Sequence, residues 1–392
     1  MKEAYLVMVN ANNNNNKYYH MVQMNDGMFE VTYGRVGKAG QTREYPIWDW
    51  DKKYYEKIDK GYRDVTELQS APVKEEYATS SGTEAVNELL ETLHYYSSNY
   101  IKENYRVGAD KVTPKMVDEA QGIIARMQKA ANKSDIMQFN WLCEELFMVI
   151  PRIIPNVKEA VAKELSDMTT ILEREQAKLN VMNSSVEIKK VNGKSLADSM
   201  GIEIREVTEE EKQNILNHLD NSTKSRFVRA FRVVNAKTEK KFNDFVKKNG
   251  YADEDIKFLY HGSRNQNWEG ILSQGLKLNN KAPKTGHMLG RGHYFSRPGN
   301  TTKSVNYTSL QSAYWNHENE KKGFIAVYKV AMKNPKHMYD YENGMNRFTQ
   351  KEMDAQGFDG VYAHKNSGFL RNDELVVYED CRCTVRYFIE VA

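Results

Sequence analysis

The feature that most constrains this chain is the spacing of its apolar residues, which changes twice along the sequence. Between residues 4 and 69, short alternations of apolar and polar residues are separated by Asn, Gly and Asp, which is typical of β-strands and turns. Between residues 84 and 180, apolar residues recur every three or four positions, as on one face of a helix. From about residue 185 short alternating runs return, mixed with short helical segments. The pattern predicts a multidomain α+β protein with a small β-rich domain, an all-α helical bundle, and an α+β domain built on antiparallel sheets.

The polar stretch APVKEEYATSSGT separates the first two parts of the chain. We therefore expect domains at residues 1–78, 79–183 and 184–392. A chain of 392 residues is long enough for each of the three to bury a core of its own.

Local signals predict individual elements within these domains. In the first domain we expect strands over 5–10, 17–24 and 29–37 and a helix over 50–60. The run Asn12–Asn16 is of low complexity, and we interpret it as an over-long hairpin loop without a functional role.

In the second domain, Thr113-Pro114 is a helix start signal, and Pro151 and Pro155 separate the third helix from the fourth. The fourth helix is predicted over 157–182, followed by a strand over 185–191.

Charge and cysteine content limit the classes of function. The net charge is +3 overall and zero over residues 1–72, so charge alone does not predict nucleic-acid binding. No apolar run approaches the roughly 18 residues of a membrane span, and the N-terminus does not resemble a signal peptide. Three cysteines, with Cys143 far in the sequence from Cys381 and Cys383, favour reduced thiols in an intracellular compartment.

A group of side chains in the last domain is suited to gripping a flat polar ligand. His261, Gly262 and Ser263 follow an apolar pair at the end of a predicted strand. Residues 286–296, GHMLGRGHYFS, hold three glycines, which let the backbone approach a ligand closely.

Two tyrosines and a serine follow in the same region. Tyr294, Ser304 and Tyr307 together offer two rings and a hydroxyl, which suit an aromatic carboxamide. Taken singly, each such residue is more often a turn or core residue, and Glu374 is most often a solvated strand end.

The three segments LYHGSRNQNWEGILSQGLK, GHMLGRGHYFS and NDELVVYED, in this order, resemble the catalytic domain of the poly(ADP-ribose) polymerases. The resemblance implies NAD+ as the substrate and no metal. It implies that NAD+ is bound by His261, Gly262, Ser263, Gly290, Arg291, Tyr294, Ser304 and Tyr307. It also implies that Glu374 is the catalytic carboxylate, assisted by His261, Tyr294 and Lys303.

The resemblance extends to the other two domains. FEVTYGRVGKAGQTREYP resembles the WGR domain, with Tyr33 in place of the tryptophan before Gly34 and Arg35, and the helical middle resembles the helical regulatory domain of the family. These matches imply that Tyr33, Gly34 and Arg35 bind DNA strand breaks with 5′-phosphorylated ends. They further imply that DNA binding loosens a helical domain that otherwise blocks NAD+ access.

The resemblance implies a DNA-dependent polymerase that modifies acceptor proteins, including itself, and has no membrane partner. It would act in the nucleus of a eukaryote, or in the cytoplasm or nucleoid of a bacterium or phage-infected cell. Two alternatives stay open: a mono(ADP-ribosyl)transferase, and a DNA-end-binding module with weak transferase activity.

Overall fold

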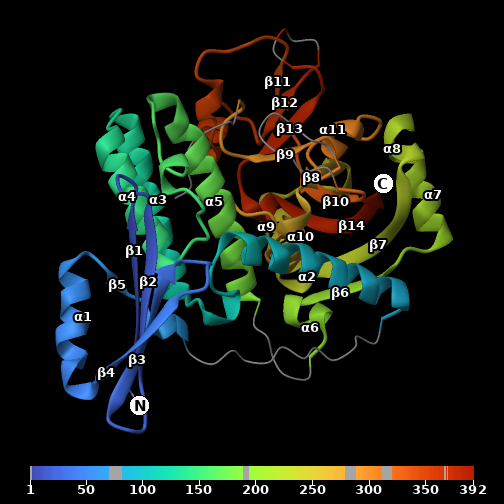
Figure 1. Cartoon of the computed structure of the whole chain (residues 1–392). Coiled ribbons are helices and arrows are strands. Elements are labelled where there is room, and N and C mark those ends of the chain that lie inside the picture. Colours follow the sequence, from blue (N-terminus) through green and yellow to red (C-terminus); the bar gives the residue numbers. More distant parts are fainter. Residues whose placement is uncertain are drawn as a thin grey trace. The chain divides into compact units, whose positions relative to one another are not determined.

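The computed structural model describes residues 2–69, 82–188, 194–278, 288–310, 320–365, 368 and 370–392 (Figure 1). The chain divides into two compact units. Within the described residues, the first unit consists of 2–69 and 98–187, and the second of 82–97, 188, 194–278 and the described residues from 288 onward. Among the described residues, no helix combines the length and apolar character that a membrane crossing requires.

The first unit begins with a five-stranded antiparallel sheet in the order β4-β3-β2-β1-β5. Its elements are β1 (Glu3–Asn10), β2 (Asn15–Gln23), β3 (Met28–Arg35), β4 (Gln41–Pro46), α1 (Trp50–Asp59) and β5 (Arg63–Asp64). One face, with Leu6 and Phe29, packs against Trp50 of α1, while the other, with Tyr5 and Val7, packs against the helices. The sheet is therefore covered on both faces. The expected strands and helix are present, and β4 was not predicted because its residues are polar and mostly exposed.

The helical part of this unit contains the end of α2 (Glu84–Asn104), α3 (Pro114–Asn132), α4 (Ile136–Val149) and α5 (Leu165–Glu187). Thr113 caps α3 by accepting a hydrogen bond from the Met116 amide, as its sequence signal predicted. The helix expected over 157–182 begins only at Leu165, because Asp167 caps the amides of Lys163 and Glu164 there.

The strand predicted over 185–191 is wrong in its described part, since α5 continues through Glu187. The buried residues Leu179, Val181 and Met182 and the partly buried Val186 keep helical spacing and pack with the bundle, which extends the helix past the predicted strand start. Residues 189–191 of that prediction, and 71–81 of the polar linker, lie outside the described residues.

The second unit contains two sheets. The larger is antiparallel, in the order β6-β7-β14-β10-β8, and the smaller has the order β11-β12-β13-β9, with one parallel pair, β11 and β12. The strands are β6 (Ile202–Glu206), β7 (Phe227–Asn235), β8 (Ile256–Ser263), β9 (His293–Phe295), β10 (Gly323–Ala331), β11 (Lys336–Met338), β12 (Val361–Ala363), β13 (Glu374–Val377) and β14 (Cys383–Val391). The helices are the first part of α2, α6 (Leu196–Met200), α7 (Glu209–His218), α8 (Asn221–Ser225), α9 (Ala236–Asn249), α10 (Trp268–Gln274), α11 (Thr302–Val305) and α12 (Gln350–Ala355).

The two sheets of the second unit meet at one backbone contact. Tyr260 of β8 and Ser296, just after β9, exchange two amide-to-carbonyl hydrogen bonds of 2.8 Å. Behind this junction lies a core that contains Trp268, Phe324 and Phe388. The expected fold class, a multidomain α+β chain with a β-rich start, a helical middle and an antiparallel α+β end, is confirmed. The boundaries at residues 78 and 183 stay a prediction.

Candidate active site

His261 lies on β8, the edge strand of the larger sheet, directly beyond the junction with the smaller one. Its Nδ1 donates to the carbonyl oxygen of Tyr294 over 2.9 Å, which leaves the lone pair on Nε2. The rings of Trp268, Phe295 and Tyr328 stand edge-on around the imidazole. Burial lowers the pKa of His261 to about 4, so at neutral pH it is a neutral ring whose Nε2 accepts hydrogen bonds.

Glu374 is the first residue of β13 and forms an ion pair with Lys303 of α11, with 2.9 Å between Nζ and Oε1. Both side chains are largely enclosed, at 12% and 7% exposed. Burial lowers the pKa of Lys303, and the carboxylate of Glu374 opposes that change. Lys303 thus balances the charge of a carboxylate that is largely shielded from water. In such a site the carboxylate would act strongly on positive charge that develops in a bound ligand.

Tyr294 lies on β9, opposite Val376 of β13. Its hydroxyl donates to the Gly290 carbonyl over 2.7 Å and accepts from the Leu289 amide, so the glycine loop holds the ring in place. Gly290 has φ of +76°, and a Cβ there would lie 2.2 Å from the Phe348 carbonyl oxygen. Burial is also the main reason that the pKa of Tyr294 is raised. Gly286 and His287 of the same motif lie outside the described residues.

Gly262 and Ser304 are brought together by a close approach of β8 and α11. A Cβ on Gly262 would lie 1.8 Å from the Ser304 carbonyl oxygen, so only glycine fits. The Ser304 hydroxyl donates to the Tyr260 carbonyl over 3.0 Å and lies 2.7 Å from the Ser296 hydroxyl. With its proton on the Tyr260 carbonyl and one lone pair accepting from Ser296, the hydroxyl keeps a second lone pair that can accept a hydrogen bond from a ligand.

The remaining predicted residues differ in their relation to this cluster. Tyr307 follows α11 and is 47% exposed. Its pKa is raised mainly by burial, and the negative charge of Glu374 adds to the increase. Ser263 accepts from the Asn267 side-chain amide and therefore helps to hold the turn before α10. Arg291 lies in the glycine loop, where burial lowers its pKa.

We expect Gly262→Ala to lower kcat/KM by about 100-fold, because its methyl group would displace α11 and with it Lys303 and Ser304. Steady-state kinetics and thermal unfolding of the same preparation would check this. Gly122→Ala is the matched control, since a Cβ at Gly122 meets no atom within 4 Å. Unchanged kinetics in Gly262→Ala would show that this approach is not needed.

Tyr33, Gly34 and Arg35 lie at the end of β3 in the first unit. Arg35 donates to the carbonyls of Asn14, Ile154 and Pro155, at 2.9, 3.1 and 2.7 Å. Tyr33 has its ring beside Tyr19, with centroids 6.1 Å apart. Arg35 therefore joins the strand end to the segment between α4 and α5.

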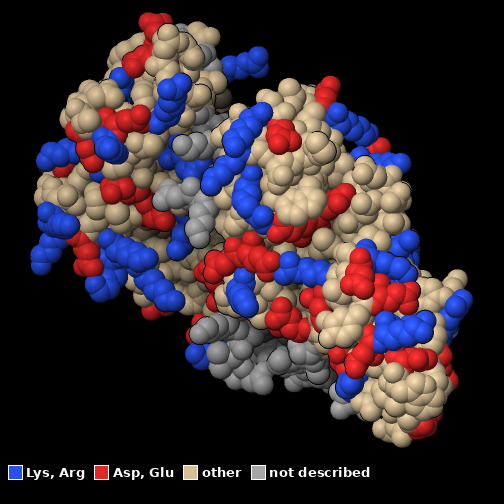
Figure 2. All heavy atoms as spheres, turned by 90° about the vertical axis from the view of Figure 1, so that its left-hand side faces the viewer, with Lys and Arg blue, Asp and Glu red and all other residues tan. Residues whose placement is uncertain are grey.

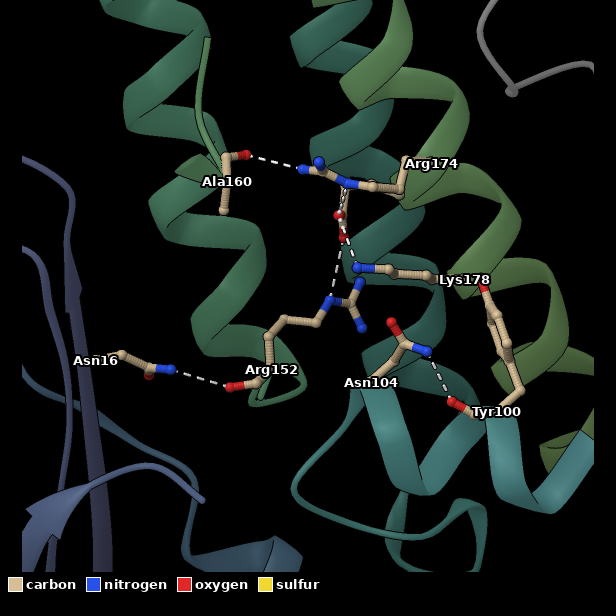
Figure 3. Close-up of polar contacts among 8 residues, drawn as sticks. Asn16, Tyr100, Asn104, Arg152, Ala160, Arg174 and Lys178 are labelled. Carbon is tan, nitrogen blue, oxygen red and sulfur yellow. Dashed lines mark hydrogen bonds and ion pairs between the residues drawn. The ribbon is translucent and has the colours of Figure 1, made fainter. Parts of the chain in front are cut away.

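The asparagine run closes the hairpin between β1 and β2, as expected, but it also makes contacts beyond the sheet that were not predicted. Asn14 adopts φ of +51°, and its side-chain oxygen accepts from the Val157 amide over 2.8 Å. Asn16 is buried and donates to the Arg152 carbonyl over 3.1 Å (Figure 3). The run thus connects the sheet to the helical part, which composition alone did not reveal.

Arg152, a second residue that sequence reasoning missed, lies in a buried charge cluster of the first unit. Arg152, Arg174 and Lys178 converge in Figure 3, and their ion-pair partner is Glu175, at 3.2, 3.0 and 3.3 Å. Burial raises the pKa of Glu175, but the attraction of the three cations outweighs it and lowers the pKa to about 2. The Arg152 guanidinium also lies over the Tyr105 ring, at 3.9 Å from its centroid.

Charge on the surface is mixed. In the face shown in Figure 2, Lys and Arg side chains alternate with Asp and Glu, without a continuous basic band among the residues described. Any nucleic-acid binding on this face must therefore depend on individual contacts. Within the described ranges, no three His, Cys, Asp or Glu side chains gather so that they could hold a metal ion.

Comparison with known proteins gives two family matches. Residues 206–392 match the poly(ADP-ribose) polymerase catalytic domain, and residues 2–69 match the WGR domain. Poly [ADP-ribose] polymerase 2 of Zea mays is 22% identical over 471 aligned residues, covering 99% of this chain and 70% of that protein.

Two further relatives match shorter parts of the chain. The uncharacterized protein 101L of Invertebrate iridescent virus 6 is 29% identical over 181 residues, which are 46% of this chain and 76% of that protein. Poly [ADP-ribose] polymerase 2 of Homo sapiens is 52% identical over 50 residues, 12% of this chain and 8% of that protein. Residues 206–392 are thus a poly(ADP-ribose) polymerase catalytic domain and residues 2–69 a WGR domain, and the chain is similar to poly [ADP-ribose] polymerase 2 proteins over nearly its whole length.

Proposed function

We propose that the protein transfers ADP-ribose from NAD+ to acceptor proteins, itself included, and to a growing polymer, with release of nicotinamide. The observation that carries the proposal is the enclosed Lys303–Glu374 pair, at the start of a strand that pairs with the Tyr294 strand. The family match of the catalytic domain and the similarity to poly(ADP-ribose) polymerases support it.

In the proposed reaction, the bond between nicotinamide and the ribose C1′ breaks and the acceptor oxygen bonds to C1′. Positive charge develops on the ribose as nicotinamide leaves, and the Glu374 carboxylate stabilises it while accepting a hydrogen bond from the 2′-hydroxyl. The proton of the acceptor hydroxyl passes to Glu374 or to solvent. Tyr294 and Tyr307 would flank the nicotinamide ring, Gly262 and Ser304 would bond its carboxamide, and Ser263, Gly290 and Arg291 would line the rest of the site.

The neutral state of His261 leads to a pH prediction. If Nε2 accepts a hydroxyl of the dinucleotide, KM for NAD+ should not change on account of His261 between pH 8 and about pH 5.5. It should rise as the pH approaches the folded-state value of about 4, because the imidazolium cannot accept. Equilibrium binding of NAD+ across this range, with His261→Asn as the reference, would check it. Binding lost around the ordinary histidine pKa of about 6.5 would contradict the assignment.

The product distinguishes polymerase from mono(ADP-ribosyl)transferase. Labelled NAD+ followed by a sizing gel would show a ladder for a polymerase and a single modified band for a mono-transferase. Asn372, two residues before Glu374, stands where longer-chain polymerases of the family carry an aromatic residue, and this favours keeping the mono-transferase as the second candidate.

We further propose that the enzyme responds to DNA strand breaks with 5′-phosphorylated ends through Tyr33, Gly34 and Arg35. The match of residues 2–69 to the WGR domain supports this, and the helical part would be the regulatory domain. Because Arg35 joins β3 to the segment after α4, a DNA end that competes for Arg35 would disturb the helices.

Arg35→Ala is expected to remove most of the rate increase that nicked, 5′-phosphorylated DNA produces, because it deletes the hydrogen bonds that the guanidinium donates to Asn14, Ile154 and Pro155. Initial rates with and without the nicked DNA would measure it. Lys52→Ala, which removes an exposed cation on α1, serves as the control and should keep the full response. An equal response in both variants would exclude Arg35 as the connection.

The three cysteines are free, and two of them, Cys143 and Cys383, are buried. Unpaired buried thiols fit the proposed intracellular site of action, which would be the nucleus in a eukaryotic host and the cytoplasm or nucleoid in a bacterial or phage setting.

A further inference from the structure

The first unit contains a cavity of about 580 Å³ between the turn that follows β3 and the end of α2. Tyr18, Gly37 and Lys38 line one side of it, and Lys102, Tyr105 and Arg106 line the other. Its volume falls in the range of about 300–1,000 Å³ in which proteins bind small molecules.

The residues that line the cavity do not include any that were assigned to NAD+ or DNA. Tyr18 packs against the helical core of this unit, whereas Tyr33 packs with the core under α1 on the opposite face of the sheet. Glu374 and the catalytic cluster belong to the second unit. Neither Glu374 nor Tyr33 is among the residues that line the cavity.

Three cations from two segments line this cavity: Lys38 from the turn, and Lys102 and Arg106 from α2 and the residues after it. No residue that lines the cavity is acidic, and none of the three cations pairs with a carboxylate among the described residues. Arg106 also forms a hydrogen bond with the Tyr5 hydroxyl. Burial raises the pKa of Tyr5, and the charge of Arg106 partly offsets that increase. Three cations without carboxylate partners that line one open pocket suit a phosphate group.

Two aromatic rings complete the walls. Tyr18 stacks on Tyr5, with centroids 5.9 Å apart, and Tyr105 lies under the Arg152 guanidinium. An aromatic wall beside several cations suits a ligand that carries both a flat base and phosphates, because bases stack on such rings irrespective of sequence.

We propose that this cavity binds a nucleoside diphosphate, with the base against Tyr18 and the phosphates between Lys38, Lys102 and Arg106. The cations come from both the sheet and the helical part, so the ligand bridges the two and stabilises their contact. This goes beyond the transferase function, since it assigns a second nucleotide site in the first unit.

Hydrogen–deuterium exchange of the full chain with ADP tests the proposal, in the wild type and in His261→Ala, which weakens the proposed NAD+ site. We expect ADP to protect residues 36–40 and 102–108 in both proteins. The protection should be lost in Lys102→Glu and Lys38→Glu, with Kd raised at least about tenfold. It should persist in Lys129→Glu, which makes the same charge change on an exposed position of α3.

Adenosine, pyrophosphate and ADP-ribose separate the contributions of base and phosphate. Pyrophosphate should compete with ADP, adenosine should bind more weakly, and protection by ADP-ribose would show that the diphosphate of the reaction product is accepted as well. The proposal is overturned if ADP protects neither segment, if protection is equal in Lys38→Glu and wild type, or if only a 5′-phosphorylated duplex protects them. Lys38 lies in an exposed turn, so Lys38→Glu is expected to fold. This variant therefore tests the proposal even if Lys102→Glu does not fold.

Discussion

Glu374→Gln is expected to lower the rate of ADP-ribose transfer by at least about 100-fold, equivalent to roughly 3 kcal/mol of transition-state stabilisation. The amide keeps the shape of the carboxylate and can still accept a hydrogen bond from Lys303, so the fold and NAD+ binding should change little. What is lost is the negative charge that opposes the positive charge developing on the ribose. Single-turnover transfer from labelled NAD+, together with equilibrium NAD+ binding, would separate the two effects.

The matched control is Glu210→Gln, which makes the same change at an exposed position of α7. It should transfer ADP-ribose at the wild-type rate. Normal polymer from Glu374→Gln would refute the catalytic assignment, and a loss of NAD+ binding as large as the loss of rate would make Glu374 a binding residue instead.

Glu175→Gln is expected to destabilise the first unit by about 3–5 kcal/mol, because it leaves Arg152 and two neighbouring cations without their shared counter-charge in a buried place. Hydrogen–deuterium exchange of α3 and α5 in the full chain, and the first transition in urea unfolding, would measure the change. Glu173→Gln, on an exposed position of the same helix, is the control and should lie within about 0.5 kcal/mol of wild type.

The difference in unfolding free energy between wild type and Glu175→Gln should depend on pH, because the pKa of Glu175 is lowered in the folded state. A carboxyl group whose pKa is lower in the folded state stabilises the fold above its unfolded value, here 4.5, and this contribution disappears as the pH falls through about 2. The gap between wild type and Glu175→Gln should therefore be full at pH 6 and shrink below pH 4.5. A gap that does not change with pH would mean that packing, not charge, is responsible.

Much of the architecture follows from local patterns that the sequence displays. The helices α3 and α4 were predictable because Thr113-Pro114 starts one and Pro151 follows the other, and their apolar residues keep helical spacing. The main strands β1, β2, β10 and β14 were predictable because they alternate or are continuously apolar. By contrast, β4 has no apolar face, so its pairing with β3 depends on backbone hydrogen bonds that composition does not encode.

The candidate site was found through motif order, and its geometry was not accessible from sequence. Nothing in the spacing of Gly262 and Ser304 reveals that a single methyl group would separate them, because the contact joins residues about 40 positions apart. Likewise, Arg152 follows Pro151 in what reads as a linker, and its burial beside Glu175 depends on how α5 packs. The lone polar residues of linkers are where pattern-based inference is weakest.

The asparagine run has a consequence for how this chain can vary. Asn10 pairs with Asn15 and Val9 with Asn16, so the loop has a defined length, and Asn14 and Asn16 each bond a specific group beyond the sheet. Tracts of one amino acid commonly lengthen or shorten when genes are copied. Here a single added or lost asparagine would change the length of the turn that places Asn14, whose side chain accepts from the Val157 amide. We therefore expect the length of this repeat to be under selection even though its letters are all alike.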